Sequence, residues 1–231
     1  MTNQEILHQV AAYVEEHHKN DYSGHDFEHI KRVHALAKQI AATEPQANLF
    51  IVELVALMHD LDDYKLVKGE SHNTIELLNT LHMPQAQISN ITTIIDSIGF
   101  SKSGPNPTLP NLEAKILYDA DKIDGMGAIG VARAFAYGGN KSRMMFNPLQ
   151  LPEEFDLAKY QQRSLHGGNH TVNHFFDKLL KMAYLMQTRY GRKLAMERQA
   201  TMINFLDAFF AEQGLTEWRL LLKQHIEESA A

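Results

Sequence analysis

The sequence predicts an all-α protein. Apolar residues recur at intervals of three and four along most of the 231 residues, as in helices with one buried face. Residues typical of helix starts and ends separate these segments. No segment shows a convincing alternation of apolar and polar residues, which would indicate a half-buried strand.

The N-terminal part of the chain contains clear helix boundaries. Thr2 and Glu5 have the spacing of a capping box, and a helical apolar pattern follows them. Residues 26–42 repeat that pattern, and Pro45 ends the helix because it cannot continue the hydrogen-bond ladder. Residues 47–60 are apolar on almost every side, which predicts a buried helix.

Three further helical segments lie in the middle of the chain. Asn73, with Glu76 three residues later, indicates a capped helix start. Pro84 suits the first turn of a helix that runs to about Ile98. Residues 112–137 are helical in period but contain three glycines, which predict a break or close helix packing.

The C-terminal part begins with an irregular segment. Residues 138–168 are rich in Gly and Pro and form a loop, a lid or a domain boundary. Two amphipathic segments follow at about 170–187 and 193–213, and a short helix follows Gly214.

Composition excludes several classes of protein. The net charge of −6 and the pI of about 6.1 disfavour a binder of nucleic-acid polymers. The lack of cysteine excludes disulfides and thiolate ligands and fits a reducing compartment. The start of the sequence has no signal-peptide pattern, and the apolar run at 49–58 is too short to span a bilayer. We therefore expect a cytoplasmic protein without a membrane partner. His17, His18 and His225 lie in charged segments, so we expect these three side chains to be solvated.

A spaced set of metal-ligand residues is the main functional signal: His29, the adjacent pair His59 and Asp60, and then Asp121. Taken singly, His29 is more often a packed or surface histidine, and Asp121 is more often exposed. Jointly they indicate a site, because His59 and Asp60 end an apolar helix where polar side chains need partners. Asp121 shares a helical face with Leu117, which points it toward the core, where a cation or an arginine could meet its charge. Two imidazoles and two carboxylates can hold one divalent cation with coordination positions left open.

These residues lie within motifs of a known family. The segments Gly24–Val33, Met58–Asp60 and Asp119–Asp124 resemble, in order and spacing, the HD-domain metal-dependent phosphohydrolases. Residues 173–180 resemble an element of small bacterial proteins similar to nucleoside triphosphate pyrophosphohydrolases. The resemblance covers roughly residues 20–213. It implies an HD-domain helical bundle, with one domain over 1–231.

The resemblance implies a core at about 20–137, with helices within 170–213 completing the site. It makes His29, His59, Asp60 and Asp121 the metal ligands. It also places Asp63 where it could orient water or accept its proton. The alternative is that Asp62 and Asp63 only cap a helix end.

Basic residues are candidates for phosphate contact. Lys65 could meet a phosphate or pair with Asp63, and His25 could line the site or merely precede a helix. Arg133 reaches the same pocket only if the glycines before it bend the chain. His174 and Lys178 are one helical turn apart, and the resemblance favours them over a solvated stripe.

The predicted cofactor is one divalent ion, with Mn²⁺ first and Fe²⁺, Co²⁺, Ni²⁺, Zn²⁺ or Mg²⁺ as alternatives. Nitrogen ligands suit the transition metals better than Mg²⁺, which prefers oxygen. The expected substrate is a small phosphorylated compound, a nucleoside triphosphate cleaved to monophosphate and pyrophosphate. A phosphomonoesterase, a non-catalytic nucleotide sensor and a di-iron oxygenase are the alternatives. The sequence leaves the oligomeric state open.

Overall fold

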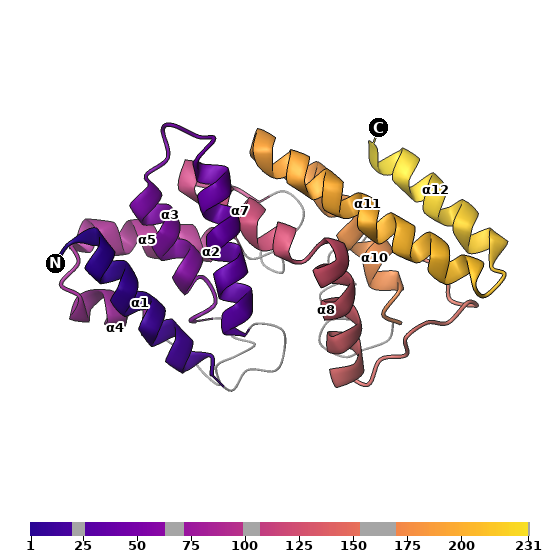
Figure 1. Cartoon of the computed structure of the whole chain (residues 1–231), viewed down its shortest axis with the longest axis horizontal. Coiled ribbons are helices and arrows are strands. Elements are labelled where there is room, and N and C mark those ends of the chain that lie inside the picture. The colour runs from indigo at the N-terminus through magenta and orange to yellow at the C-terminus, as the bar shows by residue number, and fades with distance from the viewer. Residues whose placement is uncertain (20–25, 63–71, 99–106, 153–169, 231) are drawn as a thin grey trace. The chain divides into compact units, whose positions relative to one another are not determined.

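In the computed structural model, the described residues are 1–19, 26–62, 72–98, 107–152 and 170–230 (Figure 1). Within them the structure is helical throughout and contains no strand, so the predicted all-α class is confirmed. No helix in these ranges has both the length and the apolar character needed to cross a membrane. The chain divides into two compact units, residues 1–121 and 122–231.

Unit 1 is built around α2 and α3, which pack against each other, with α1 and α5 also against α3 (Figure 1). Its core consists of apolar side chains that recur at helical spacing, as the sequence predicts. Its helices are α1 (Asn3–His17), α2 (Phe27–Ala41), α3 (Leu49–Met58), α4 (Asn73–Thr80), α5 (Gln85–Ser97) and most of α7 (Leu112–Asp124).

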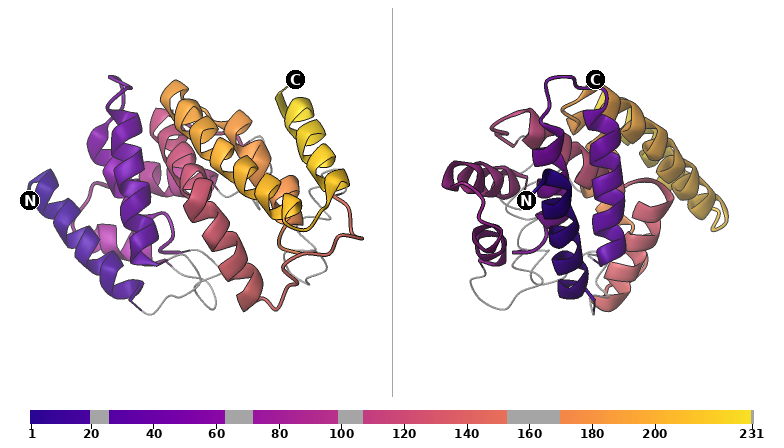
Figure 2. Two further views of the ribbon diagram at one scale, coloured as in Figure 1. Left: turned by 45° about the vertical axis from the view of Figure 1, so that its right-hand side comes forward. Right: turned by 60° about the vertical axis from the view of Figure 1, so that its left-hand side comes forward.

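Unit 2 contains the end of α7 and the helices that follow it. The long α11 packs against α8, α12 and the 3-10 helix η1 (Figure 2). An aromatic cluster that includes Phe146, Phe210 and Trp218 fills its core. Its remaining elements are α8 (Gly127–Asn140), α10 (Asn173–Asp177), η1 (Leu179–Leu185), α11 (Arg189–Ala211) and α12 (Thr216–Ala230).

The break predicted within 112–137 lies between α7 and α8. Gly127 starts α8 with a φ of +71°, a conformation that L side chains rarely adopt. A Cβ atom there would also lie 3.2 Å from side-chain carbons of Arg198. The glycine therefore permits both the turn and the close approach of α11.

Two local predictions are wrong. Asn73 does not cap α4, because it is the first residue of the helix. Asp62 caps the helix instead: its two carboxylate oxygens accept hydrogen bonds from the backbone N–H groups of Asn73 and Thr74. The prediction of solvated histidines fails for His18, which is buried with its Nδ1 2.9 Å from the carbonyl oxygen of Val14, and for His225, which is half-buried. Asp62 lies eleven residues before Asn73, beyond the local sequence pattern.

Candidate metal centre

His29 is positioned by the first turn of α2. The carboxylate of Asp26 accepts a hydrogen bond from the backbone N–H of His29 at 2.9 Å, which caps the helix and fixes where it begins. His29 shares the buried face of α2 with Ile30 and Val33. The imidazole is therefore held inside unit 1 by an ordinary amphipathic helix with a well-placed cap.

His59 and Asp60 follow the buried helix α3. Asn48 caps its start, and its apolar residues leave little of the helix exposed. His59 is the C-cap residue, and Asp60 lies in the turn that follows it. An apolar helix thus carries two polar side chains into the interior at its end, where each needs a partner.

Polar contacts fix α2, α3 and α7 relative to one another. Glu53 of α3 lies 3.1 Å from Nε2 of His34 and 3.0 Å from Nζ of Lys38, both on α2. The backbone N–H of Asn48 donates to Oε1 of Glu113 at 2.9 Å, which joins the starts of α3 and α7. These contacts set the spacing between the helices that carry the site.

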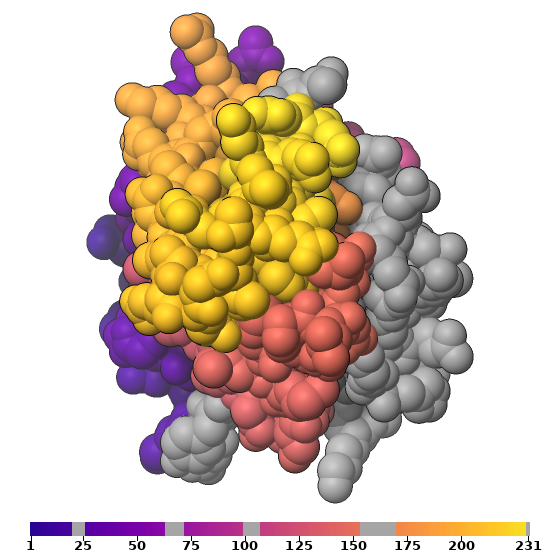
Figure 3. Space-filling view, turned by 90° about the vertical axis from the view of Figure 1, so that its right-hand side faces the viewer, coloured from indigo at the N-terminus to yellow at the C-terminus, as the bar shows by residue number. Residues whose placement is uncertain are grey.

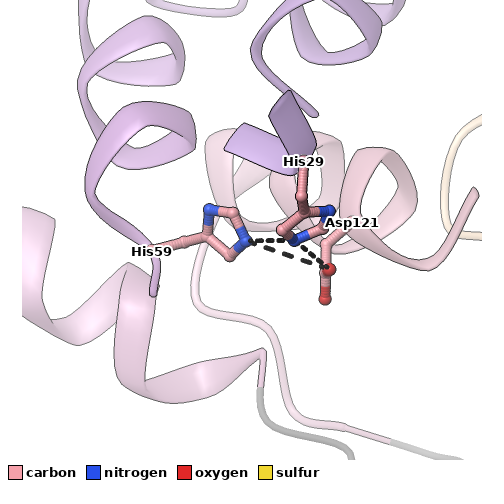
Figure 4. A group of neighbouring side chains, drawn as sticks. All are labelled: His29, His59 and Asp121. Atoms are coloured by element: carbon pink, nitrogen blue, oxygen red, sulfur yellow. Dashed lines mark hydrogen bonds and ion pairs between the residues drawn. The ribbon is translucent and has the colours of Figure 1, made fainter. Parts of the chain in front are cut away.

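Four side chains converge in unit 1, three of which are drawn in Figure 4. Nε2 of His29 and Nε2 of His59 are 3.3 Å apart. Oδ2 of Asp60 lies 3.4 Å from Nε2 of His29 and 3.5 Å from Nε2 of His59. Oδ1 of Asp121 lies 3.8 and 3.9 Å from the same two nitrogens. Residues more than ninety positions apart in the sequence are thus brought together as predicted.

These distances fit a single cation. With bonds of about 2.1 Å, neighbouring ligand atoms are separated by roughly 3.0–3.4 Å and opposite ones by roughly 4.2 Å. The separations given above fall between these limits. His29, His59 and Asp121 therefore form a possible metal site, with Asp60 beside it.

The hydrogen bond of His59 also suits a metal ligand. Its Nδ1 lies 2.9 Å from the carbonyl oxygen of Ala56, which can only accept, so the ring proton is on Nδ1. Nε2 then carries a lone pair and faces His29, Asp60 and Asp121. A backbone carbonyl that fixes the tautomer in this way is a usual partner of a metal-bound histidine.

The centre is buried but has an accessible side. The side chains of His29 and His59 are 0% and 1% exposed, and that of Asp60 is 9% exposed. The side chain of Asp121 is 21% exposed, so the centre is not fully enclosed. Burial, and then the negative charges of Asp119 and Asp121, raise the pKa of the neighbouring Tyr118.

Two further acidic residues lie beside Asp121 in α7. Asp119 and Asp124 are fully buried. Nη1 of Arg133 donates to Oδ2 of Asp124 at 2.7 Å. Arg133, a predicted substrate contact, thus binds a buried carboxylate of its own unit.

The other predicted site residues have different outcomes. His25, Asp63 and Lys65 lie outside the described residues, so their roles stay predictions. His174 and Lys178 lie in unit 2, on one helical turn, where the backbone N–H of Lys178 donates to the carbonyl of His174. The capping role of Asp26 is not among the predictions, although its place directly before a helical pattern indicates it.

Comparison with known proteins identifies the family. Residues 26–126 match the HD domain, a range that contains all four converging residues. The Bacillus subtilis protein YpgQ is 33% identical over 202 residues, which cover 86% of this chain and 89% of YpgQ. The chain belongs to the HD domain family. The predicted resemblance to HD-domain proteins is therefore confirmed.

Solved structures share the fold over nearly the whole chain. A Lactobacillus plantarum protein has a TM-score of 0.80 at 33% identity, covering 93% of this chain and 99% of that one. An HD-superfamily hydrolase from Bacillus thuringiensis has a TM-score of 0.71 at 32% identity, covering 92% and 99%. YpgQ in complex with ADP has a TM-score of 0.71 at 31% identity, covering 92% and 97%. The likeness to an HD-superfamily hydrolase supports a hydrolase activity for this chain.

Proposed function

We propose that this HD-domain protein is a divalent-metal-dependent phosphohydrolase that cleaves a nucleoside triphosphate to a monophosphate and pyrophosphate. The observation that carries the metal-dependent chemistry is that Nε2 of His29 and Nε2 of His59 lie 3.3 Å apart, with a carboxylate oxygen of Asp60 and one of Asp121 each 3.4–3.9 Å from both nitrogens. When bound there, a divalent cation would polarise a phosphoryl oxygen and lower the pKa of water.

The residues of the chain contribute binding and proton transfer. Two neutral imidazoles and two ionised carboxylates would bring a divalent cation to zero net charge, so a phosphoryl oxygen would bind through an open coordination position of the ion and not through an excess of positive charge. Asp63 follows this centre closely in sequence, and we assign it the proton transfer from the attacking water. We also assign Lys65 to contact with the phosphoryl group and His25 to the lining of the centre.

The choice of a nucleoside triphosphate rests on charge and on a relative. A phosphomonoester carries about two negative charges near neutral pH. A single cation and one Arg could meet those charges, whereas a triphosphate makes better use of additional basic residues such as His174 and Lys178. The YpgQ structure with ADP supports a nucleotide ligand in this family.

Product analysis with Mn²⁺ tests the proposal. Nucleoside triphosphates, diphosphates and monophosphates are incubated with the full chain, and the products are separated by ion-exchange chromatography. We expect monophosphate and pyrophosphate from the triphosphate. Diphosphate with inorganic phosphate, or activity confined to monoesters, would contradict the assignment of the cleaved bond while leaving the metal centre intact.

The Asp63→Asn variant tests the proton-transfer role in the same assay. It should keep its bound metal and its KM, with kcat lower by ~10²–10⁴-fold. A near-normal kcat would return Asp63 to a helix-capping role, and loss of metal would make it a ligand.

A further inference from the structure

His59 and Asp60 lie in a turn that follows α3, and we call residues 59–62 the ligand turn. The helix ends at Met58, and residues 59–62 have turn conformation. The backbone N–H of Leu61 donates to the carbonyl of Met58 at 3.0 Å, and Leu61 is fully buried. Because the ligand turn lies outside the regular hydrogen-bond ladder of a helix, the place of its two metal ligands depends on what holds its far end.

Asp62, the last residue of the ligand turn, is bonded to the start of α4. Its Oδ1 accepts a hydrogen bond from the backbone N–H of Asn73 at 2.8 Å, and its Oδ2 accepts one from that of Thr74 at 3.0 Å. His72, which directly precedes the helix, makes no side-chain cap bond. A carboxylate is a strong acceptor for such N–H donors, and its charge is favourable at the positive end of a helix. The side chain of Asp62 therefore does for α4 what an N-cap residue ordinarily does.

Asn73 returns a hydrogen bond to the ligand turn. Its Nδ2 donates to the carbonyl oxygen of Leu61 at 3.3 Å. Leu61 directly follows Asp60, so this bond fixes the main chain on the C-terminal side of that ligand. Thr74, the other donor to Asp62, is 3% exposed, so the start of α4 is itself anchored in unit 1. The ligand turn is thus joined to a packed helix by bonds in both directions.

We propose that Asp62 and Asn73 are positioning residues that hold Asp60 in place for the cation. His59 is fixed separately by its bond to the carbonyl of Ala56, so Asp60 depends more on the contact with α4. Short segments at helix ends open locally at a lower free energy than the whole protein. A ligand that occupies its binding position for only part of the time lowers the apparent affinity of the site by that fraction. The proposal rests on the proposed function only in that Asp60 binds the metal.

Titration of the full chain with Mn²⁺ tests this role, with the free ion measured by electron paramagnetic resonance. We expect Asp62→Ala to weaken binding at least ~10-fold, as the loss of a group behind a metal ligand usually does. Asp62→Asn should bind at least ~3-fold more tightly than Asp62→Ala, because its amide oxygen still caps the helix. Both variants lack the negative charge, so this difference separates positioning from the electrostatic effect of Asp62 on the cation. Asn73→Ala changes no charge and should weaken binding at least ~3-fold through the lost bond to Leu61.

Amide hydrogen exchange in the presence of EDTA tests the same contact without metal and without activity. The N–H groups of Leu61, Asn73 and Thr74 should exchange at least ~5-fold faster in Asp62→Ala than in the wild type. Amides of α2 in unit 1 and of α12, the outermost helix in Figure 3, serve as references. A general loss of stability would speed their exchange as well, whereas a local opening of the ligand turn would not.

Glu76→Gln is the matched control. Glu76 is an exposed carboxylate of the same helix, so this variant removes one negative charge from α4 and leaves the contact with the ligand turn intact. It should keep the wild-type affinity for Mn²⁺ and the wild-type exchange rate at Leu61. Asp62→Asn and Asn73→Ala are mild changes, so the test does not depend on the folding of Asp62→Ala.

The outcomes distinguish this role from the proposed function. Equal affinities of Asp62→Ala and Asp62→Asn, or a loss in Glu76→Gln as large as that in Asp62→Ala, would overturn the positioning role. Faster exchange at Asn73 and Thr74 with unchanged exchange at Leu61 would also overturn it, since Asp62 would then only cap α4. A wild-type chain that binds no Mn²⁺ would refute the metal centre and this role together. Neither measurement contains a nucleotide, so a different cleaved bond would leave both results standing.

Discussion

At the scale of single residues, two buried polar side chains show how a specific partner fixes a group in the interior. His59 is fixed by the carbonyl of Ala56, and Asp124 by the guanidinium of Arg133. The Asp124 carboxylate is fully buried, and the Arg133 side chain is 22% exposed. Removing the arginine would leave a buried carboxylate with less compensation, and this is costly in a protein interior.

We therefore expect Arg133→Ala to lower the free energy of unfolding by about 3 kcal/mol. Urea unfolding followed by circular dichroism measures this. The double variant Arg133→Met with Asp124→Leu is the control, since an apolar pair of similar volume should recover most of the loss. A destabilisation by Arg133→Ala of less than about 0.5 kcal/mol would show that the pair contributes little, as exposed ion pairs do.

At the scale of helices, close packing at glycines joins α7 to α8. A Cβ atom on Gly130 would lie 2.2 Å from the carbonyl oxygen of Gly125, a backbone atom that cannot move aside easily. Gly139, in the same helix, has no atom within 4 Å of such a Cβ. The two positions therefore differ in packing while sharing a helix.

This difference gives a paired prediction. Gly130→Ala should destabilise the protein by ~1–3 kcal/mol through steric overlap. Gly139→Ala should be neutral or stabilise it by up to ~1 kcal/mol, because alanine has the higher helix propensity. Thermal unfolding of both variants checks this, and equal melting temperatures would argue against the overlap at Gly130.

The helices could be predicted from sequence because their signals are local. The capping box at Thr2 and the break after α7 are confirmed, since cap spacing and glycine content report on the nearest few residues. Asp62 caps α4 from eleven residues away, and Arg198 donates to the carbonyl of Ile123 from 75 residues away. Such partners depend on how helices pack, and no nearby sequence pattern indicates them.

The same distinction between local signals and distant partners applies to the candidate metal centre and its surroundings. His29, His59, Asp60 and Asp121 could be predicted because polar ligands in apolar helices are unusual and match a family pattern. The partner of Arg133 could not be predicted, because its pairing with Asp124 depends on the turn between α7 and α8.

At the scale of the molecule, buried histidines make stability depend on pH. In unit 2, burial is the main cause that lowers the pKa of His170, of His174 to about 3 and of His225 to about 4. The positive charge of Lys181 lowers the pKa of His225 further. A folded pKa below the ordinary value of 6.5 means that the unfolded chain gains protons first as the pH falls. The contribution of these neutral histidines to the free energy of unfolding is therefore fully present above pH 6.5 and declines below it.

We expect the free energy of unfolding to decrease between pH 6.5 and 4.5, with each such histidine contributing at most ~1.4 kcal/mol per pH unit. His225→Phe should reduce this dependence, because the ring keeps its contact with Phe176 and loses the titrating group. Urea unfolding at several pH values measures it, with the exposed His8→Gln as control. A slope in His225→Phe identical to that of the wild type would contradict the assignment to His225.

We propose that His29, His59, Asp60 and Asp121 together hold one divalent cation. The most direct test is the metal content of the purified chain by plasma mass spectrometry after reconstitution with Mn²⁺ and gel filtration. We predict about one ion per chain in the wild type and in His8→Gln, and a loss of bound metal in both His59→Ala and Asp60→Ala, because each loses one ligand and leaves a polar neighbour unpaired. Full metal occupancy in both ligand variants would contradict the claim.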